Sequence, residues 1–503
     1  MEHAAPHPCS LAKVGAKTGH PPSRVNTLLV VPTLAIILVA LALLRPVDHD
    51  ESQYVAAAIL TAHGLLPYKD FAYLQTPLQP YLFASIAALA GTWTWPTLRI
   101  TNALLGAATI AAVHRAARIG GASTCAAIIA AALFATCDIL LFSIGTARND
   151  ALPACCVALA LPAIVRTARD QASRRDALLI GALLAAATTA KISYALPALT
   201  YGIWTLFRAD RRPWWTLLGT LPFVALTTAL FLQAPEGFLF GVIGFPGQAP
   251  TEWYQARPWK LSNAAKIIDT LKFLALGPAL LAIVATTGRR HRWHLILDLL
   301  IVAGLIAALA PVPTWRQYLL PMLPALFVRL ALVWHAQPPG KAMRIAAVVF
   351  ACAGLAPTVD AVASGGIPMR DAMRNATAIR ETLDREHVTG PVATLSPQFL
   401  PGRAIDPRFA TGPFYVRSTA LLDSDQERQL RLVSHARMRL LGQPPAILTG
   451  GEGAWSSGDD RIDAALATYA IHQGYRAVPV PGTRFTLYVA PPASQPPAPH
   501  NSP

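Results

Sequence analysis

Long apolar runs fill the chain as far as residue 358 and are rare beyond it. A helix needs about 20 apolar residues to cross the hydrocarbon core of a bilayer. By that criterion about eleven membrane-spanning helices are expected. They are expected near 27–44, 98–117, 122–142, 151–166, 177–190, 193–207, 213–232, 266–286, 294–310, 317–334 and 343–358. The first run ends in a charged cluster without a small-residue cleavage site, which predicts a retained anchor.

Basic residues concentrate in alternate connections between these runs. The basic loops lie near 115–118, 166–175, 208–212, 289–292 and 341–344. The positive-inside rule places them in the cytoplasm, with the N-terminal tail 1–26, and places residues after 358 outside. This topology requires that the short apolar stretch 77–91, which contains two prolines, does not cross. We therefore predict one long outer loop over 45–97 with interfacial or re-entrant helices, one of them around 52–63.

Beyond Pro357 the composition becomes that of a soluble domain, through to about residue 492. Short β-like runs occur at 391–395, 446–448, 476–480 and 485–489, and helical patterns at 370–385, 426–441 and 462–473. This alternation predicts a small extracytoplasmic α/β domain over 359–492. Residues 493–503 are rich in Pro and Ser, which predicts a disordered tail. The expected architecture is thus an α-helical polytopic membrane domain, 27–358, followed by this small domain.

Composition agrees with a multi-pass membrane protein, since 53% of the residues are hydrophobic and only 14% are charged. The formal charge of +15 does not indicate nucleic-acid binding, because the basic residues are spread over short loops rather than gathered in one patch. Most of the six cysteines lie inside apolar runs without the paired spacing of a metal site. We expect them to be packing residues.

Four ionisable residues, 48–51, follow the first apolar run directly. Ionisable groups close to hydrocarbon are costly, so the cluster is a candidate site for chemistry or ion binding, although a solvated loop that ends the helix is the alternative. Other predicted outer helix ends carry Arg148 with Asp150, Lys191 and Arg316. Each has a structural alternative: the cations could be snorkelling anchors and Asp150 could be a helix N-cap. Their common side predicts one shared site.

The order of several local motifs is informative as a set. They are Asp50-Glu51 with Tyr54, Gly64 to Asp70 with Tyr68, Thr76-Pro77 to Tyr81, Leu98-Arg99, Asp150, Thr189-Ala190-Lys191 and Tyr318 to Pro324. In this order they resemble the GT-C glycosyltransferases, specifically the branch of protein O-mannosyltransferases and lipid A aminoarabinose transferases. The resemblance covers about residues 28–335.

The resemblance implies an inverting glycosyltransferase that moves a sugar from a polyprenyl-phosphate carrier to an acceptor hydroxyl on the outer membrane face. By that resemblance Asp50 is the catalytic base and Asp150 a second acid of the site, with Glu51 beside Asp50. An acceptor hydroxyl needs such a base, whereas the departing phosphate needs charge stabilisation. The expected phosphate-binding residues are Lys191 and Arg316, with Arg148 behind them, and Tyr54, Tyr68 and Tyr318 are expected to contact substrate.

The chain departs from the family pattern at Thr76, where many relatives carry a lysine facing the donor phosphate. Because Thr76 is neutral, Lys191 and Arg316 become the main candidates for binding the donor phosphate. No cofactor is expected to be required and no metal site is assigned, although residues 48–51 could supply ligands to a divalent cation. The expected partners are a polyprenyl-phosphate-linked sugar, a lipid, glycan or protein acceptor, and membrane lipids, in the plasma (inner) membrane of a bacterial-type cell envelope.

Two other classes of function stay open. A transporter or flippase of lipid-linked sugars would have broken helices near the membrane midplane. A non-catalytic scaffold would act through residues 359–492 alone. Two smaller features have two interpretations each: the aromatic connection 233–265 is either a mobile flap or an interfacial belt, and Gly458-Asp459-Asp460 is either a turn or a site.

Overall fold

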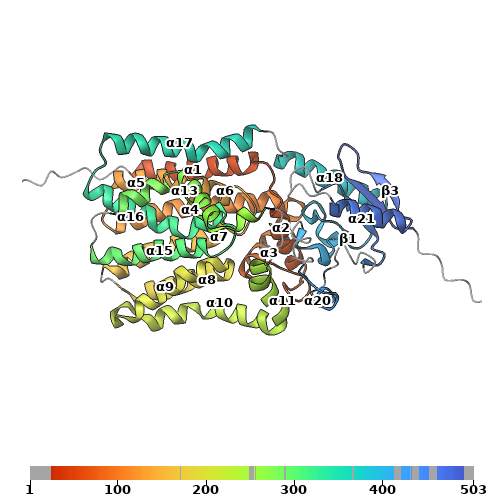
Figure 1. Ribbon diagram of the computed structural model, residues 1–503, viewed down its shortest axis with the longest axis horizontal. Coiled ribbons are helices and arrows are strands. Elements are labelled where there is room, and N and C mark those ends of the chain that lie inside the picture. Colours follow the sequence, from red (N-terminus) through yellow and green to blue (C-terminus); the bar gives the residue numbers. More distant parts are fainter. Residues whose placement is uncertain are drawn as a thin grey trace, which may run out of the picture.

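The computed structural model is an elongated molecule with a helical bundle at one end and a small sheet at the other (Figure 1). It describes residues 24–169, 172–248, 254, 257–287, 291–364, 368–412, 421–430, 432, 441–451 and 461–491. The N-terminal tail 1–23, the tail 492–503, Cys9, Trp253 and the Gly458-Asp459-Asp460 patch lie outside these residues, and so does most of the helix predicted over 426–441.

The bundle is built from helices that coincide with the predicted apolar runs. Its members are α1 (Arg24–Leu44), α4 (Thr94–Ile119), α5 (Thr124–Ala135), α6 (Asp138–Ile144), α7 (Ala151–Ala168), α8 (Arg174–Ala190), α9 (Ala195–Leu206), α10 (Pro213–Gln233), α13 (Asn263–Ala275), α14 (Ala279–Thr286), α15 (Leu295–Leu309), α16 (Leu323–Ala336) and α17 (Lys341–Ala363). Their buried apolar residues form one continuous core, in which α4 packs against α7 and α7 against α8. The large apolar side chains left exposed lie mostly on these same helices, as expected of surfaces that face lipid.

Five of the described helical segments are both long enough and apolar enough to cross a membrane: 151–168, 209–233, 292–309, 316–336 and 341–363. Two bent pairs raise the number to seven when each counts as one span: α5 with α6, bent by 66°, and α13 with α14, bent by 94°. The structure therefore supports a multi-pass membrane protein with several apolar helices. The larger number of crossings, about eleven, stays a prediction.

Close backbone contact between α8 and α10 depends on two glycines. A Cβ on Gly181 would lie 1.9 Å from the Thr216 carbonyl oxygen, and one on Gly219 would lie 2.2 Å from the Leu178 carbonyl oxygen. Small residues let membrane helices approach in this way, because packing is then gained without side chains in between.

Helices α2 (Glu51–Ala62) and α3 (Leu78–Ala90) occupy the predicted outer loop and lie between the bundle and the sheet (Figure 1). Both are shorter than a crossing, as the positive-inside argument requires for the stretch 77–91. In the connection 233–265 the chain forms α11 (Pro235–Leu239) and the π-helical turn η4 (Phe240–Gly244). Glycines of this segment pack against the 68–73 loop, since a Cβ on Gly237 would lie 2.6 Å from the Tyr68 carbonyl oxygen. These described residues are therefore tied to the outer loop.

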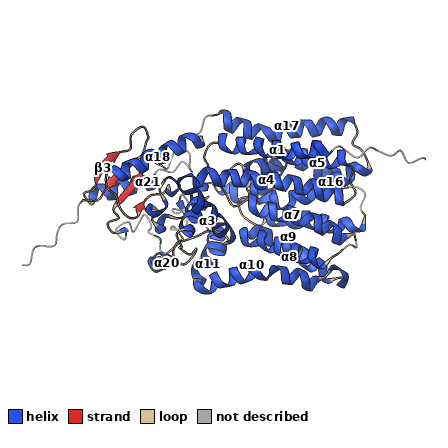
Figure 2. Cartoon of the chain, turned by 180° about the vertical axis from the view of Figure 1, so that it is seen from behind, coloured by secondary structure: helices blue, strands red, loops and turns tan. Residues whose placement is uncertain are grey.

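The four strands of the described residues all lie in the C-terminal part (Figure 2). They are β1 (Val392–Ala393), β2 (Ala446–Thr449), β3 (Arg476–Pro479) and β4 (Thr486–Val489), in the order β1-β2-β4-β3. β1 pairs parallel to β2, with Val392 opposite Ala446, and β4 runs antiparallel to β2 and β3. The accompanying helices are α18 (Met369–Arg385), α20 (Ser424–Gln429) and α21 (Arg461–His472). The strands and the two longer helices match the predicted segments, while the boundaries of the domain stay a prediction.

Candidate active site

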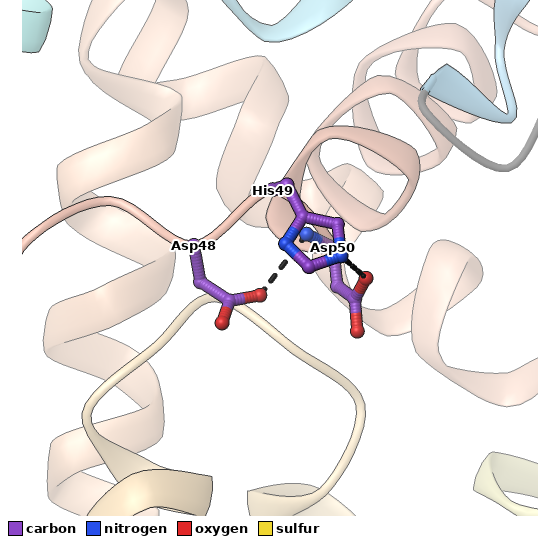
Figure 3. A group of neighbouring side chains, drawn as sticks. All are labelled: Asp48, His49 and Asp50. Carbon is purple, nitrogen blue, oxygen red and sulfur yellow. Dashed lines mark hydrogen bonds and ion pairs between the residues drawn. The ribbon is translucent and has the colours of Figure 1, made fainter. Parts of the chain in front are cut away.

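The residue before α2 is the centre of an ion-pair network. The Asp50 backbone N–H donates to Asp48 Oδ1 at 3.0 Å, and its carboxylate Oδ1 lies 2.9 Å from His49 Nε2 (Figure 3). The Arg148 guanidinium binds the other carboxylate oxygen of Asp50 and also Asp48 Oδ1 at 3.2 Å. Only 9% of Asp50 is exposed, so its charge is held mainly by these partners.

Arg148 also connects this carboxylate to a second one. Its Nε lies 3.3 Å from Asp150 Oδ2, and Lys191 Nζ binds Asp150 Oδ1. Asp150 occupies the N-cap position of α7, but its side chain makes no capping hydrogen bond. Lys191 ends α8, and burial lowers its pKa while Asp150 pulls it the other way. The Asp150 carboxylate therefore stabilises the protonated form of this buried lysine.

Glu51 does not share the environment of Asp50. Its two carboxylate oxygens accept from Arg99 Nε at 2.7 Å and Arg99 Nη2 at 2.6 Å, and also from the backbone N–H groups of Ala147 at 2.5 Å and Asp48 at 2.8 Å. Both side chains are fully buried. With four donors on two oxygens, Glu51 has no capacity left for a substrate proton. The geometry therefore favours a structural role for Glu51, as the partner of Arg99 that fixes the start of α2, and the expected catalytic role stays a prediction.

Arg316 is close to the network but is paired elsewhere. It lies 2.9 Å from Asp138 Oδ2, and its guanidinium carbon stands 3.7 Å from the centre of the Phe142 ring. Arg45 and Arg148 lie against the same ring, at 5.1 and 5.2 Å. Phe142 thus gathers three guanidinium groups that come from three separate connections. Burial, together with the charge of Arg316, lowers the pKa of Arg45 to about 10.

The charges of this region do not cancel. Outside the closed Glu51–Arg99 pair, the network and the Phe142 cluster hold four basic side chains, 45, 148, 191 and 316, against four carboxylates, 48, 50, 138 and 150. Burial lowers the pKa of the His49 imidazole, but the charge and hydrogen bond of Asp50 together with the charge of Asp48 raise it to about 9, so His49 adds a positive charge. The region carries a net positive charge and is suited to an anionic group.

The three tyrosines separate into two environments. Tyr318 lies 5.5 Å from Lys191 Nζ, and Tyr54 is buried beside the network, where burial raises the pKa of its phenol well above the usual value. Tyr68 instead donates its hydroxyl to the Gln75 carbonyl oxygen at 2.5 Å and packs against Phe238. The structure brings Tyr54 and Tyr318 to the network, whereas Tyr68 fastens the outer loop to α11.

Neutral groups occupy the position where many relatives carry a lysine. Thr76 is 4% exposed and its hydroxyl has no partner among the described residues. The neighbouring Gln75 side chain accepts from Asn149 Nδ2 at 3.3 Å. The described residues therefore offer no cation at this position, and the nearby positive charge comes from the Phe142 cluster and Lys191.

Asp48, His49 and Asp50 are also the described residues best placed to bind a metal ion, with one ligand atom from each within 4.8 Å of the others. Two features oppose that use. Arg148 already binds both carboxylates, and His49 is protonated at neutral pH because its pKa is about 9. A cation would have to displace the guanidinium and the imidazole proton together.

His49 makes the stability of the fold depend on pH. Its pKa is about 9 in the folded chain and 6.5 ordinarily, so its stabilisation is complete below pH 6.5 and is lost as pH rises to 9. We expect the melting temperature to fall over this interval, and to fall less in a His49→Gln variant. His335→Gln, at an exposed helix end, is the control. Thermal unfolding at several pH values checks this, and equal falls in all three proteins would contradict it.

Sequence reasoning missed three members of the site: Arg45, Asp138 and Phe142. A signal existed for Asp138, the one acidic residue within the apolar run 122–142, because isolated charges in such runs mark functional positions. Arg45 had the appearance of an ordinary helix-end anchor, and nothing in the sequence marks Phe142.

The network, at the ends of apolar helices and beside a small α/β layer, defines a polytopic membrane protein with a charged site at one end of its bundle. A family model described as dolichyl-phosphate-mannose-protein mannosyltransferase matches residues 74–238, which include Arg148, Asp150 and Lys191 but not Asp50. A search of curated protein sequences finds no match.

Among solved structures the chain is similar to ArnT from Cupriavidus metallidurans. With the form bound to undecaprenyl phosphate it shares 15% identity and a TM-score of 0.59 over 93% of this chain and 100% of that one. With the apo form it shares 15% identity and a TM-score of 0.55, over 94% of this chain and 100% of that one. The chain therefore has the fold of the GT-C membrane glycosyltransferases, and the resemblance inferred from its motifs is confirmed at the level of the fold.

Proposed function

We propose that the chain is an inverting glycosyltransferase that moves a sugar from a polyprenyl-phosphate carrier to an acceptor hydroxyl. One observation carries the proposal: a nearly buried carboxylate, Asp50, is linked through Arg148 to the Asp150–Lys191 pair. This arrangement places a proton acceptor beside a reserve of positive charge. The likeness to ArnT in complex with undecaprenyl phosphate supports the choice of carrier.

In the proposed reaction Asp50 is the base. His49 and Arg148 keep its carboxylate ionised, the state in which it can accept a proton. The acceptor oxygen attacks the anomeric carbon and gives its proton to Asp50, and the bond from that carbon to the phosphate oxygen breaks with its electron pair. One displacement inverts the anomeric carbon. The transferred sugar is a hexose or a pentose, and the residues that contact the sugar ring select between them.

The departing phosphate gains a negative charge that the site must stabilise. We assign that role to Lys191 and Arg316, helped by Arg45 and with Arg148 behind them. Asp150 is then a positioning residue, because it binds Arg148 and Lys191 at once. Tyr54 and Tyr318 border the same space and are the proposed substrate contacts.

No cofactor is required in this scheme, because the basic side chains supply the charge stabilisation that a cation would otherwise give. A divalent cation could still bind at Asp48 and Asp50 after displacing Arg148. The proposed setting is a bacterial-type plasma membrane, with the N-terminus inside and residues 359–492 outside. The acceptor is a lipid, glycan or protein of the cell envelope.

One observation favours the flippase alternative. The breaks of the two bent helix pairs touch, since the Asp138 N–H donates to the Leu276 carbonyl oxygen at 3.1 Å and Gly277 packs against Cys137. Broken helices are typical of transporters. In this chain, however, Asp138 at the break binds Arg316 of the proposed phosphate site. The breaks are thus compatible with the transferase as well, and the Asp50 network supports the transferase of the two.

Label transfer tests the proposal. Purified protein in lipid is given a panel of radiolabelled polyprenyl-phosphate sugars and an envelope extract, with and without EDTA. We expect label to move from one donor into a new product at the same rate in both conditions. Loss of transfer in EDTA would overturn the metal-independent mechanism. Donor that crosses vesicles without forming product would establish the flippase instead.

A further inference from the structure

A cavity of about 650 Å³ lies between α2, the α3–α4 junction, α18 and the loop 397–403 of the C-terminal part. These segments meet at the middle of the molecule (Figure 1). The cavity is separate from the Asp50 network. It is lined by Val55, Ile59 and Ala62 of α2, and at 100° per residue these positions face about a third of a turn away from Asp50 and Tyr54.

The cavity wall contains polar groups without partners. Gln398 is 5% exposed, and both its amide oxygen and its amide nitrogen lack a hydrogen bond among the described residues. The indole N–H of Trp95, itself 2% exposed, lacks one as well. A buried polar group left unpaired costs about 1–3 kcal/mol, so these groups are available to hydrogen-bond a hydroxyl-bearing ligand.

The lining is mostly neutral, and its charged side chains are basic. Arg380 and Arg403 line the cavity, and the described residues give neither of them an ion pair or hydrogen bond. His63 is the third basic member, and no Asp or Glu belongs to the lining. Guanidinium groups without a carboxylate partner are the usual means of binding phosphate.

The cavity also offers an aromatic surface and fixed walls. Trp93, at its rim, is 63% exposed, whereas Trp95 is held edge-on against Phe399 at 5.4 Å. The opposite wall is fixed by Gly402, where a Cβ would lie 2.3 Å from the His63 ring. An exposed indole in the wall of a cavity with polar groups suits the apolar face of a sugar ring.

We propose that this cavity binds a phosphorylated saccharide: the two arginines bind the phosphate, Gln398 and the Trp95 N–H bind hydroxyl groups, and Trp93 covers the ring. Its volume lies within the range of about 300–1,000 Å³ typical of small-molecule sites. Binding of the phosphorylated saccharide does not depend on catalysis. The role of the cavity is to hold an acceptor glycan beside the active site, and this role rests on the proposed function.

Binding to the full chain carrying Asp50→Asn, in nanodiscs, tests the site without any transfer. The probes are glucose 6-phosphate, glucose and inorganic phosphate, and their binding is measured by calorimetry or ligand-observed NMR. We expect glucose 6-phosphate to bind at least about tenfold more tightly than either of the others, as two charge-assisted contacts add to the sugar contacts. Equal binding of phosphate alone, or no saturable binding, would overturn the proposal.

Three variants localise the binding. Arg380→Gln with Arg403→Gln is expected to weaken glucose 6-phosphate binding at least about tenfold, and Gln398→Leu to weaken it while leaving phosphate binding unchanged. Arg374→Gln, an exposed neighbour on α18 that pairs with Asp371, should change nothing. Wild-type affinity in the double variant would overturn the assignment even if Gln398→Leu failed to fold. Nanodiscs with phosphatidylglycerol should bind the probe as phosphatidylcholine ones do; competition there would show a lipid head group in the cavity instead.

Discussion

An Asp50→Asn variant is expected to transfer sugar about 10²–10⁴ times more slowly than wild type, with a donor KM changed by no more than a few-fold. Asparagine keeps the shape of the side chain and can still accept a hydrogen bond from Arg148, but it cannot take the acceptor proton. The loss should therefore fall on kcat. Initial rates over a range of donor concentrations measure it, alongside thermal unfolding to show that the fold is kept.

The matched control is Asp48→Asn. Asp48 contacts the same guanidinium, at 3.2 Å, and is more exposed than Asp50, with 20% of its side chain accessible against 13%. We expect the control to lose much less activity, since it only weakens the hold on Arg148. Equal losses in both variants would assign Asp50 to charge balance rather than to proton transfer.

A Glu51→Gln variant is expected to lose about 3–5 kcal/mol of folding stability, because it leaves the Arg99 guanidinium buried without its counter-charge. Both side chains of the pair are 0% exposed, and Arg99 also donates to three backbone carbonyl oxygens that tie it to the end of α1. The start of α2, and with it Asp50, should become disordered. Thermal unfolding in detergent or nanodiscs checks the result.

Two further proteins separate this structural role from a catalytic one. Asp210→Asn removes half of an exposed ion pair, Arg208–Asp210, and should leave the melting temperature unchanged. A double variant, Glu51→Gln with Arg99→Met, should recover part of the loss, because no unpaired charge is then buried. A Glu51→Gln protein with wild-type stability and no activity would contradict the structural assignment and return Glu51 to the catalytic residues.

The helices of this fold were predictable because burial in a bilayer or a bundle core requires long apolar runs. The run 177–190 became Arg174–Ala190 and the run 213–232 became Pro213–Gln233. The strand Ala446–Thr449 was equally visible, since all four of its residues are buried. The bends between α5 and α6 and between α13 and α14 were not predicted, because hydropathy carries no information on the direction of a helix axis. Gly277-Pro278 nevertheless marks the sharper bend.

The site was predictable where charge stands next to apolar sequence and unpredictable where long-range pairing decides. Asp50, Asp150 and Lys191 could be selected because each stands at the end of a predicted helix. The different environments of Asp50 and its neighbour Glu51 could not be predicted, because Glu51 pairs with Arg99, which lies 48 positions away in the sequence. Arg316 could be selected because it begins a predicted helix, but its partner Asp138 lies 178 positions away, and no pattern in the sequence pairs the two.

The configuration of the newly formed glycosidic bond tests the central claim most directly. Wild-type protein would be given the donor identified by label transfer, prepared with one defined anomeric configuration, and the linkage in the product would be determined by NMR. A single displacement assisted by Asp50 predicts the opposite configuration to that of the donor, and a rate of product formation about 10²–10⁴ times lower with Asp50→Asn. Retention of the donor configuration would contradict the account, because it requires two displacements through a covalent intermediate.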